Sequence, residues 1–284
     1  MVRPLLVTGS HGQLGRAVLD EASARGLAAE GRDIDTLDIT DPDAVARWVS
    51  TSRPGLVINC AADTAVDDCE AHESEARAVN ATAVDHLARA CNAVDATLIH
   101  VSTDYVFDGT ADRPYRETDP VAPIGAYGRT KLLGERAAAA AIRHLIVRTA
   151  WLYGHGGRHF VDAIRGQVER GTNPLRVVGD QHGSPTYSVD LAAAMLDLAE
   201  RDAVGVVHAV NRGATTWHGF AEEIVRLLGA DVEVRAVTTD EFPRPAPRPA
   251  YSVLDTTRLE QLLGRPMPTW QNALARYLEA ACES

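Results

Sequence analysis

The stretch Leu5-Leu6-Val7-Thr8-Gly9-Ser10-His11-Gly12-Gln13-Leu14-Gly15, near the start of the 284-residue chain, decides the fold. An apolar run of strand length enters a glycine-rich turn, and apolar residues then recur with helical spacing. Glycines let a backbone turn tightly and approach a pyrophosphate, which sits at the positive end of the following helix. The spacing is Gly-x-x-Gly-x-x-Gly rather than Gly-x-Gly-x-x-Gly. We expect a dinucleotide-binding turn, and the alternative is a plain strand-to-helix turn.

Strand and helix patterns alternate through the next 140 residues. Strands are expected at residues 27–30, 56–60, 97–101 and 145–149. Thr40 or Asp41 is a plausible N-cap for a helix that has Pro42 at its first position and runs through residue 48, and further helices are expected at 73–92 and 135–142. Strand-helix alternation predicts an α/β fold, a Rossmann-type doubly wound parallel sheet.

The end of the second expected strand is where such a fold meets the adenosine ribose of a dinucleotide. Carboxylates there suit a free 2′-hydroxyl, whereas an arginine suits a 2′-phosphate. Arg32, Asp33 and Asp35 supply both kinds of group, so the residues leave NADH and NADPH open.

A tyrosine and a lysine four residues apart, Tyr127 and Lys131, lie on one face of a helix. A nearby ammonium lowers the pKa of a phenol and makes it an acid-base group near neutral pH. Ser102-Thr103-Asp104 follows an expected strand, at the edge where parallel sheets bind ligands. The alternatives are a half-buried tyrosine beside a solvated lysine, and hydroxyls that only cap the next element.

Composition excludes several classes of protein. A net charge of −11 argues against nonspecific binding to nucleic acid or acidic membranes. Cys60, Cys69, Cys91 and Cys282 form no Cys-x-x-Cys pair, which favours reduced thiols and a cytoplasmic location. No apolar run approaches ~18 residues, and no secretory leader is evident. One segment is unusual in composition, the Pro- and Arg-rich residues 242–249.

Several motifs occur in order and carry a resemblance that runs from the first strand to the C-terminus. They are Thr8-Gly9-x-x-Gly12-Gln13-Leu14-Gly15, Asn59-Cys60-Ala61-Ala62, Ser102-Thr103-Asp104-Tyr105-Val106-Phe107-Asp108-Gly109, Tyr127-Gly128-x-Thr130-Lys131-x-x-Gly134-Glu135, Arg148-Thr149-Ala150-Trp151-Leu152-Tyr153-Gly154, Gly179-Asp180-Gln181-His182-Gly183-Ser184-Pro185-Thr186 and Arg248-Pro249-Ala250-Tyr251-Ser252-Val253-Leu254. The chain resembles the extended short-chain dehydrogenase/reductases and, within them, the dTDP-4-dehydrorhamnose reductase family.

The resemblance implies that the C4 keto group of dTDP-4-dehydro-L-rhamnose is reduced by NAD(P)H to give dTDP-L-rhamnose. Tyr127 would donate the proton to the C4 oxygen, Lys131 would lower the pKa of Tyr127 and hold the nicotinamide ribose, and Thr103 would hydrogen-bond the same oxygen. With Arg32 added from the residues themselves, the expected cofactor-binding residues are Gly9, His11, Gly12, Gln13, Leu14, Arg32, Asp38, Ile39, Ala61, Ala62, Thr64, Tyr127 and Lys131. The expected substrate-binding residues are Thr103, Asp104, Tyr105, Val106, Tyr127 and Trp151.

The same resemblance implies two domains. Residues 1–150 would bind the dinucleotide and residues 151–284 the nucleotide-sugar, with a helix near 189–200 packing back on the first domain. We expect NADPH as the preferred cofactor with NADH also used, no metal, and a monomer or homodimer.

Three other readings compete. A different dTDP-4-keto-6-deoxysugar reductase fits the same motifs. A related sugar-nucleotide dehydratase or epimerase is a second reading, and elimination chemistry is disfavoured because Thr103 is followed by Asp104-Tyr105 instead of Asp-Glu. A regulatory subunit of the same fold is disfavoured because Thr103, Tyr127 and Lys131 are all present.

Overall fold

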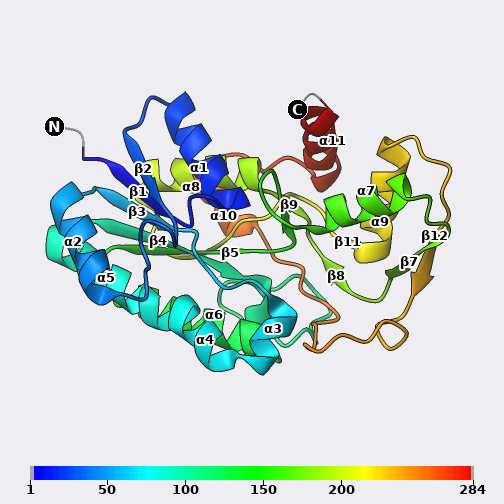
Figure 1. Ribbon diagram of the computed structural model, residues 1–284, viewed down its shortest axis with the longest axis horizontal. Coiled ribbons are helices and arrows are strands. Elements are labelled where there is room, and N and C mark those ends of the chain that lie inside the picture. The colour runs from blue at the N-terminus through cyan, green and yellow to red at the C-terminus, as the bar shows by residue number, and fades with distance from the viewer. Residues whose placement is uncertain (1–2, 283–284) are drawn as a thin grey trace.

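A computed structural model describes residues 3–282, so the outermost residues of the two expected domains, 1–2 and 283–284, lie outside it. Its centre is a six-stranded parallel sheet in the order β10-β5-β4-β3-β1-β2 (Figure 1). The strands are β1 (Leu5–Thr8), β2 (Ala29–Arg32), β3 (Leu56–Asn59), β4 (Thr97–Thr103), β5 (His144–Thr149) and β10 (Gly205–His208). The expected doubly wound α/β fold is confirmed. Its strand order reverses between β1 and β3, where such sheets bind ligands.

Helices cover both faces of this sheet because its central strands are apolar on both sides (Figure 1). One face carries α1 (Gln13–Ala24), α8 (Ser188–Glu200) and α10 (Thr257–Leu263). The other carries α2 (Pro42–Ser52), α5 (Ala83–Val94) and α6 (Ala126–Ala138). The short α3 (Val66–Ala71) and α4 (Glu73–Arg77) lie against α6.

A second lobe lies beyond the carboxyl ends of the strands (Figure 1). It contains the helices α7 (Phe160–Glu169), α9 (Trp217–Leu227) and α11 (Trp270–Cys282), which enclose a core rich in aromatic side chains. Short strands pair as β6 (Leu152–Tyr153) with β9 (Thr186–Tyr187), β7 (Leu175–Val178) with β12 (Val234–Val237), and β8 (His182–Gly183) with β11 (Thr215–Thr216).

The chain crosses between the two lobes more than once. After the first residues of the second lobe, α8 packs on α1 and β10 pairs with β5, so residues 188–208 belong to the sheet layer. Helix α10 later packs on α8 and β10. If the lobes are defined by which elements pack together, α8, β10 and α10 belong to the first lobe. The expected domain boundary at residue 150 stays a prediction.

Three expected elements differ from the structure. The second strand is Ala29–Arg32 rather than 27–30, because its pairing with β1 joins Leu5 to Ala29 and Thr8 to Arg32. The expected helix 73–92 is interrupted by a π-helical segment, Ala78–Thr82, between α4 and α5. The Ala-rich helix ends at Ala138 instead of residue 142. The helix start was correct for α2, since the Asp41 carboxylate accepts hydrogen bonds from Asp43 N and Ala44 N.

Candidate active site

The candidate site is a cavity of about 430 Å³ at the carboxyl edge of the sheet, between the two lobes. Its walls come from the turns after four parallel strands, the start of α6, and the second lobe. The lining residues are Gly9, Gly12, Gln13, Leu14, Gly15, Cys60, Ala62, Thr64, Val66, Val101, Ser102, Thr103, Asp104, Tyr105, Tyr127, Lys131, Thr149, Ala150, Trp151, Leu152, Gly157, Arg158 and Trp217. The sequence pattern thus predicted most of the first-lobe wall and little of the second-lobe wall.

The glycine-rich turn forms one side of the cavity. Gly9 has a φ of +65°, and a Cβ there would lie 2.6 Å from Ala61 N. A Cβ at Gly15 would lie 2.1 Å from Gly9 O, so α1 can approach the turn only because residue 15 is glycine. Gln13 Nε2 donates to Leu152 O over 3.3 Å, while the buried Gln13 Oε1 has no partner within residues 3–282. The close approach that these glycines allow suits a pyrophosphate bound at the start of α1.

Polar residues behind this turn connect three neighbouring strands. Thr8 Oγ1 donates to Asn59 Oδ1 over 2.6 Å, and Asn59 Nδ2 lies 3.0 Å from His100 Nδ1. All three side chains are buried, and burial lowers the pKa of His100 well below its ordinary value. His100 is therefore a neutral core histidine, which holds the strand ends together under the cavity.

Tyr127, Thr103 and Lys131 converge on the cavity from two elements. Thr103 ends β4, whereas Tyr127 and Lys131 are one turn apart on α6. Burial raises the pKa of Tyr127 above its ordinary value, and a hydrogen bond with Thr103 opposes that shift. Tyr127 is therefore a protonated phenol at neutral pH, which is the form that can donate a proton.

The ammonium of Lys131 is held by the backbone of β4. Its Nζ donates to Val101 O over 2.7 Å, and no hydrogen bond joins it to Tyr127 within residues 3–282. Burial lowers the pKa of Lys131 to about 8, while the Glu135 carboxylate opposes this. The pKa of the Tyr127 phenol therefore lies above its ordinary value, because burial and the nearby Asp104 carboxylate raise it while the Thr103 hydrogen bond opposes them.

A buried ion pair between Glu135 and Arg148 lies one helical turn after Lys131. Glu135, one turn after Lys131 on α6, receives two hydrogen bonds of 2.8 Å from the guanidinium of Arg148 on β5. Ser102 Oγ on β4 donates to the same carboxylate over 2.6 Å. The network ties α6 to β4, which carries Thr103, and to β5, so the sheet sets the position of Lys131.

Asp104 follows Thr103 and is buried at the cavity wall. Its two oxygens accept hydrogen bonds from Ser252 Oγ over 2.5 Å and from Thr103 Oγ1 over 3.0 Å. Burial raises the pKa of Asp104 to about 6, although these hydrogen bonds favour the ionised form. Asp104 therefore orients Thr103, and Ser252 brings the C-terminal segment to the same point.

Other predicted site residues lie outside the cavity lining. Val106 is fully buried in a cluster with Phe107, away from the cavity. Ile39 is buried near α2 and α5. Asp38 is exposed, and hydrogen bonds from the hydroxyl and backbone of Thr40 lower its pKa. Ala61 packs against the glycine turn, as described above.

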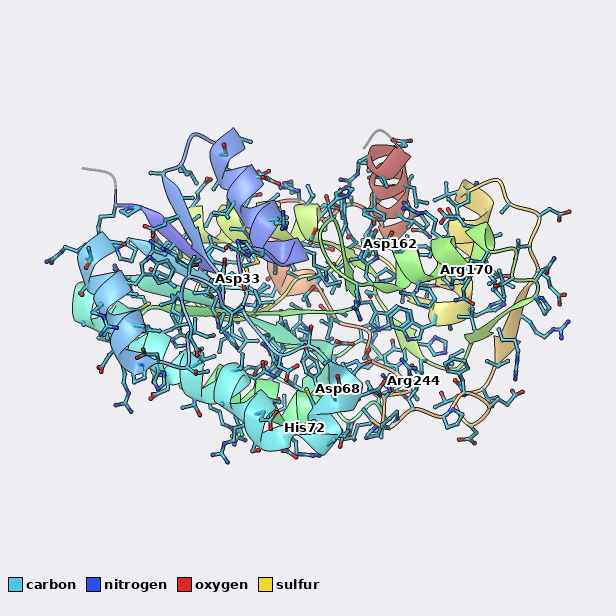
Figure 2. The ribbon with its side chains drawn as sticks, in the orientation of Figure 1. Asp33, Asp68, His72, Asp162, Arg170 and Arg244 are labelled. Carbon is cyan, nitrogen blue, oxygen red and sulfur yellow. The ribbon has the colours of Figure 1, made fainter. Side chains whose placement is uncertain are left out.

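Arg32 lines a second cleft, between β2 and α2, with Trp48 and Arg47. Its guanidinium pairs with Glu30 Oε1 over 2.8 Å, not with the aspartates that follow it. Asp33 instead accepts a 2.7 Å hydrogen bond from His11 N in the glycine-rich turn. Figure 2 shows Asp33 beside that turn, at the carboxyl edge of the sheet. Asp33 therefore lies next to the glycine-rich turn, where a dinucleotide would bind, whereas Arg32 lies next to α2.

Two tryptophans form the second-lobe wall. Trp151, which was predicted, has a φ of +47° and stacks on Trp217 with ring centroids 3.5 Å apart and planes 6° apart. Trp217 was not predicted, nor were Gly157 and Arg158. Trp217 begins α9 after the N-cap Thr216, and this cap was the one signal in the sequence that could have found the helix start.

Comparisons with known proteins agree with this geometry. A family model described as RmlD substrate binding domain matches residues 3–282. A dTDP-4-dehydrorhamnose reductase of Streptomyces griseus is 46% identical, covering 98% of this chain and 93% of that protein. A probable dTDP-4,6-dihydroxy-2-methyloxan-3-one 4-ketoreductase of Streptomyces antibioticus is 44% identical, covering 95% of this chain and 92% of that protein. The crystal structure of dTDP-4-dehydrorhamnose reductase from Bacillus anthracis in complex with NADP is 35% identical, with a TM-score of 0.95, and covers 99% of this chain and 100% of that chain.

Proposed function

Since the chain belongs to the RmlD substrate binding domain family, we propose that it reduces the C4 keto group of dTDP-4-dehydro-L-rhamnose to give dTDP-L-rhamnose, with NADPH preferred and NADH also used. One observation carries this proposal. A single cavity brings the glycine-rich turn together with Thr103, Tyr127 and Lys131. A dinucleotide-binding turn and a proton donor are the two parts that a keto reduction requires.

The residues of the cavity fit the cofactor. The glycines leave room for a pyrophosphate, and Gln13 Oε1 is free to accept a hydrogen bond from a hydroxyl group of the cofactor. Ala62 and Thr64 lie on the side where a nicotinamide would enter, next to Cys60. Bound NADPH would supply the hydride that adds to the C4 carbon.

The chain's own residues supply the proton and the positioning. Tyr127 gives its hydroxyl proton to the C4 oxygen, so the ketone becomes a secondary alcohol. Its raised pKa keeps that proton in place at neutral pH until the oxygen becomes basic. Thr103, whose one hydroxyl proton goes to Asp104 in this structure, turns that proton to the same C4 oxygen when the substrate binds. Lys131, with a pKa of about 8, remains mostly charged at neutral pH and stabilises the phenolate that forms.

A second candidate is another dTDP-4-keto-6-deoxysugar reductase. The chain is 44% identical in sequence to the Streptomyces antibioticus 4-ketoreductase and 46% identical to the Streptomyces griseus reductase, and this near-equal similarity favours the second candidate as the alternative. Both activities use the same reactive groups, so the difference lies in the sugar pocket near Trp151. We also propose a cytoplasmic location, supported by the free Cys60, Cys69 and Cys91, and a monomer or homodimer.

Product identification tests the proposal. The purified protein is incubated with NADPH and dTDP-4-dehydro-L-rhamnose, cofactor oxidation is followed by absorbance, and the sugar is identified by NMR. We expect dTDP-L-rhamnose. A higher kcat/KM with a different dTDP-4-keto sugar would establish the second candidate, and no cofactor oxidation with either would contradict both.

Within residues 3–282, no helix is long and apolar enough to cross a membrane, and no group of three or more His, Cys, Asp or Glu side chains could hold a metal ion. The expectation that the enzyme needs no metal stays a prediction. Activity in the presence of a chelator would test it.

A further inference from the structure

Two cationic side chains line the active-site cavity, and only one has a role in the chemistry above. Lys131 is buried at the reacting end, where it donates to Val101 O. Arg158 lines the second-lobe wall with Trp151 and Trp217. Arg158 is exposed, and within residues 3–282 no carboxylate or other group pairs with its guanidinium.

Several arginines within residues 3–282 form no ion pair, Arg47 and Arg170 among them, but of all the arginines only Arg158 lines the active-site cavity. Acidic side chains outnumber basic ones, 39 to 28, and most other arginines near carboxylates form ion pairs, as Arg129 does with Glu73 and Arg165 with Glu169. A free guanidinium at a cavity wall presents a planar fork of donors, which matches the oxygens of a phosphate. The arginine is therefore available to a ligand without first breaking an internal contact.

The loop that carries Arg158 is placed to reach a ligand in the cavity. A Cβ at Gly157 would lie 3.3 Å from the Gln13 side chain, and one at Gly156 would lie 2.8 Å from Arg16 Cδ. The loop therefore lies against the first turns of α1, across the cavity from α6. On its other side, His159 caps α7, and its ring contacts Tyr277 Oη over 3.1 Å. Arg158 is thus held at its base by an anchored neighbour, while its side chain stays free.

Two diphosphates would enter this cavity, and they have different partners. The cofactor's pyrophosphate has the glycine-rich turn and the N-terminus of α1, which together bind such a group without an arginine. The nucleotide-sugar carries a second diphosphate, and Lys131 is already engaged at the reacting end. We infer that Arg158 binds the diphosphate of the nucleotide-sugar substrate, from the second-lobe side of the cavity. This inference rests on the proposed function for the identity of the substrate.

The test compares Arg158→Ala with a matched control. Arg170→Ala removes the same charge at the other end of α7 (Figure 2), where Arg170 lies outside the cavity lining. For Arg158→Ala we expect the Kd for dTDP, measured by titration calorimetry, to rise about 10- to 100-fold, the range for loss of a charge-assisted hydrogen bond. The Kd values for NADPH and for thymidine should change less than twofold, and Arg170→Ala should leave all three unchanged. Arg158→Lys should restore part of the dTDP affinity.

Each other outcome would overturn the inference. A loss of affinity for NADPH instead of dTDP would assign the arginine to the cofactor's pyrophosphate. An equal loss for thymidine would mean that the variant distorts the pocket, and an equal loss in Arg170→Ala would mean that only net charge matters. Because dTDP binding needs no turnover, the titration remains decisive if the wild-type protein fails to reduce the proposed sugar.

Discussion

At the scale of single residues, the site depends on protonation states that burial sets. Tyr127 and Lys131 were predictable from their spacing, and Thr103 from its place at a strand end. Their pKa values were not predictable, because these depend on how deeply each group is buried. Burial keeps Tyr127 protonated and leaves Lys131 with a pKa of about 8, so the pair enters the reaction as a neutral acid beside a cation.

The first prediction concerns that acid. Tyr127→Phe removes the hydroxyl and keeps the ring that packs on Cys69 and Tyr105. We expect kcat to fall about 10²- to 10⁴-fold with a modest change in KM, since general-acid catalysis contributes that range. Steady-state kinetics against Tyr251→Phe, a tyrosine outside the cavity lining, provide the measurement and its control. Near-normal turnover in Tyr127→Phe would remove the residue from the mechanism.

The second prediction concerns cofactor choice. Arg32 follows Gly31 at the end of β2 and is 40% exposed, so it can turn from Glu30 toward a 2′-phosphate. Arg32→Ala should raise the KM for NADPH several-fold and barely alter that for NADH. Arg47→Ala, in the same cleft, is the matched control. Equal effects on both cofactors, or none on either, would leave the preference to Asp33 and Asp35.

At the scale of elements, the segment after β5 connects the two lobes and carries Trp151. A non-glycine residue with φ near +47° is strained, and such strain concentrates at functional sites. The ring is held by stacking on Trp217 and by Gly183, where a Cβ would lie 2.4 Å from the indole. Trp151 is thus half-buried between the cavity and the second-lobe core, and its contact with the sugar stays a prediction.

The third prediction uses this backbone strain to separate two possible roles of Trp151, contact with the substrate and packing in the core. Trp151→Ala and Trp151→Gly both lose the indole, so each should raise the substrate KM about 3- to 10-fold, as expected for one aromatic contact. The glycine variant should be more stable than the alanine variant by about 1 kcal/mol, because glycine tolerates positive φ. Kinetics and thermal unfolding measure the two effects. If both variants had normal kinetics and their free energy of unfolding fell by ~3–5 kcal/mol, Trp151 would be a core residue only.

Element positions show where sequence patterns succeed. Buried parallel strands such as β1 and β3 are continuous apolar runs and were located nearly to the residue. The edge strand β2 has the sequence Ala-Glu-Gly-Arg, which has no apolar pattern, so its register had to come from pairing with β1. Nothing in the amino-acid composition of Ala78–Thr82 predicts that this segment is π-helical.

At the scale of the molecule, the two lobes are joined by contacts between distant parts of the chain. The Pro- and Arg-rich segment 242–249 runs back from β12 to α3 (Figure 1). Its Arg248 Nη1 lies 2.9 Å from Asp67 Oδ1, and its Arg244 Nε lies 3.3 Å from Asp67 Oδ2. Figure 2 shows Arg244 beside the helix that carries Asp68. Composition marked this segment as unusual, but no local sequence pattern could predict a contact between Asp67 and Arg248, which are 181 positions apart.

The last prediction tests this connection through its pH dependence. Asp67→Asn removes the charge that Arg244 and Arg248 share, and should lower the free energy of unfolding by about 1–2 kcal/mol at pH 7. Although desolvation opposes it, the hydrogen bonds from Arg248 and Ala246 N hold the pKa of Asp67 below its ordinary 3.8. A carboxylate with a depressed folded pKa stabilises the fold above its unfolded pKa, and this stabilisation is lost as pH falls through the folded pKa.

The difference between wild type and Asp67→Asn should therefore be full above about pH 4 and should shrink as the pH falls below it. Urea unfolding between pH 3 and pH 7 measures it, and Asp68→Asn is the control. Asp68 is the next residue on α3, is exposed, and forms no ion pair within the described residues, so its variant should track the wild type at every pH. A difference that persists unchanged to the lowest pH would mean that the substitution acts through packing, and that charge at Asp67 does not hold the lobes together.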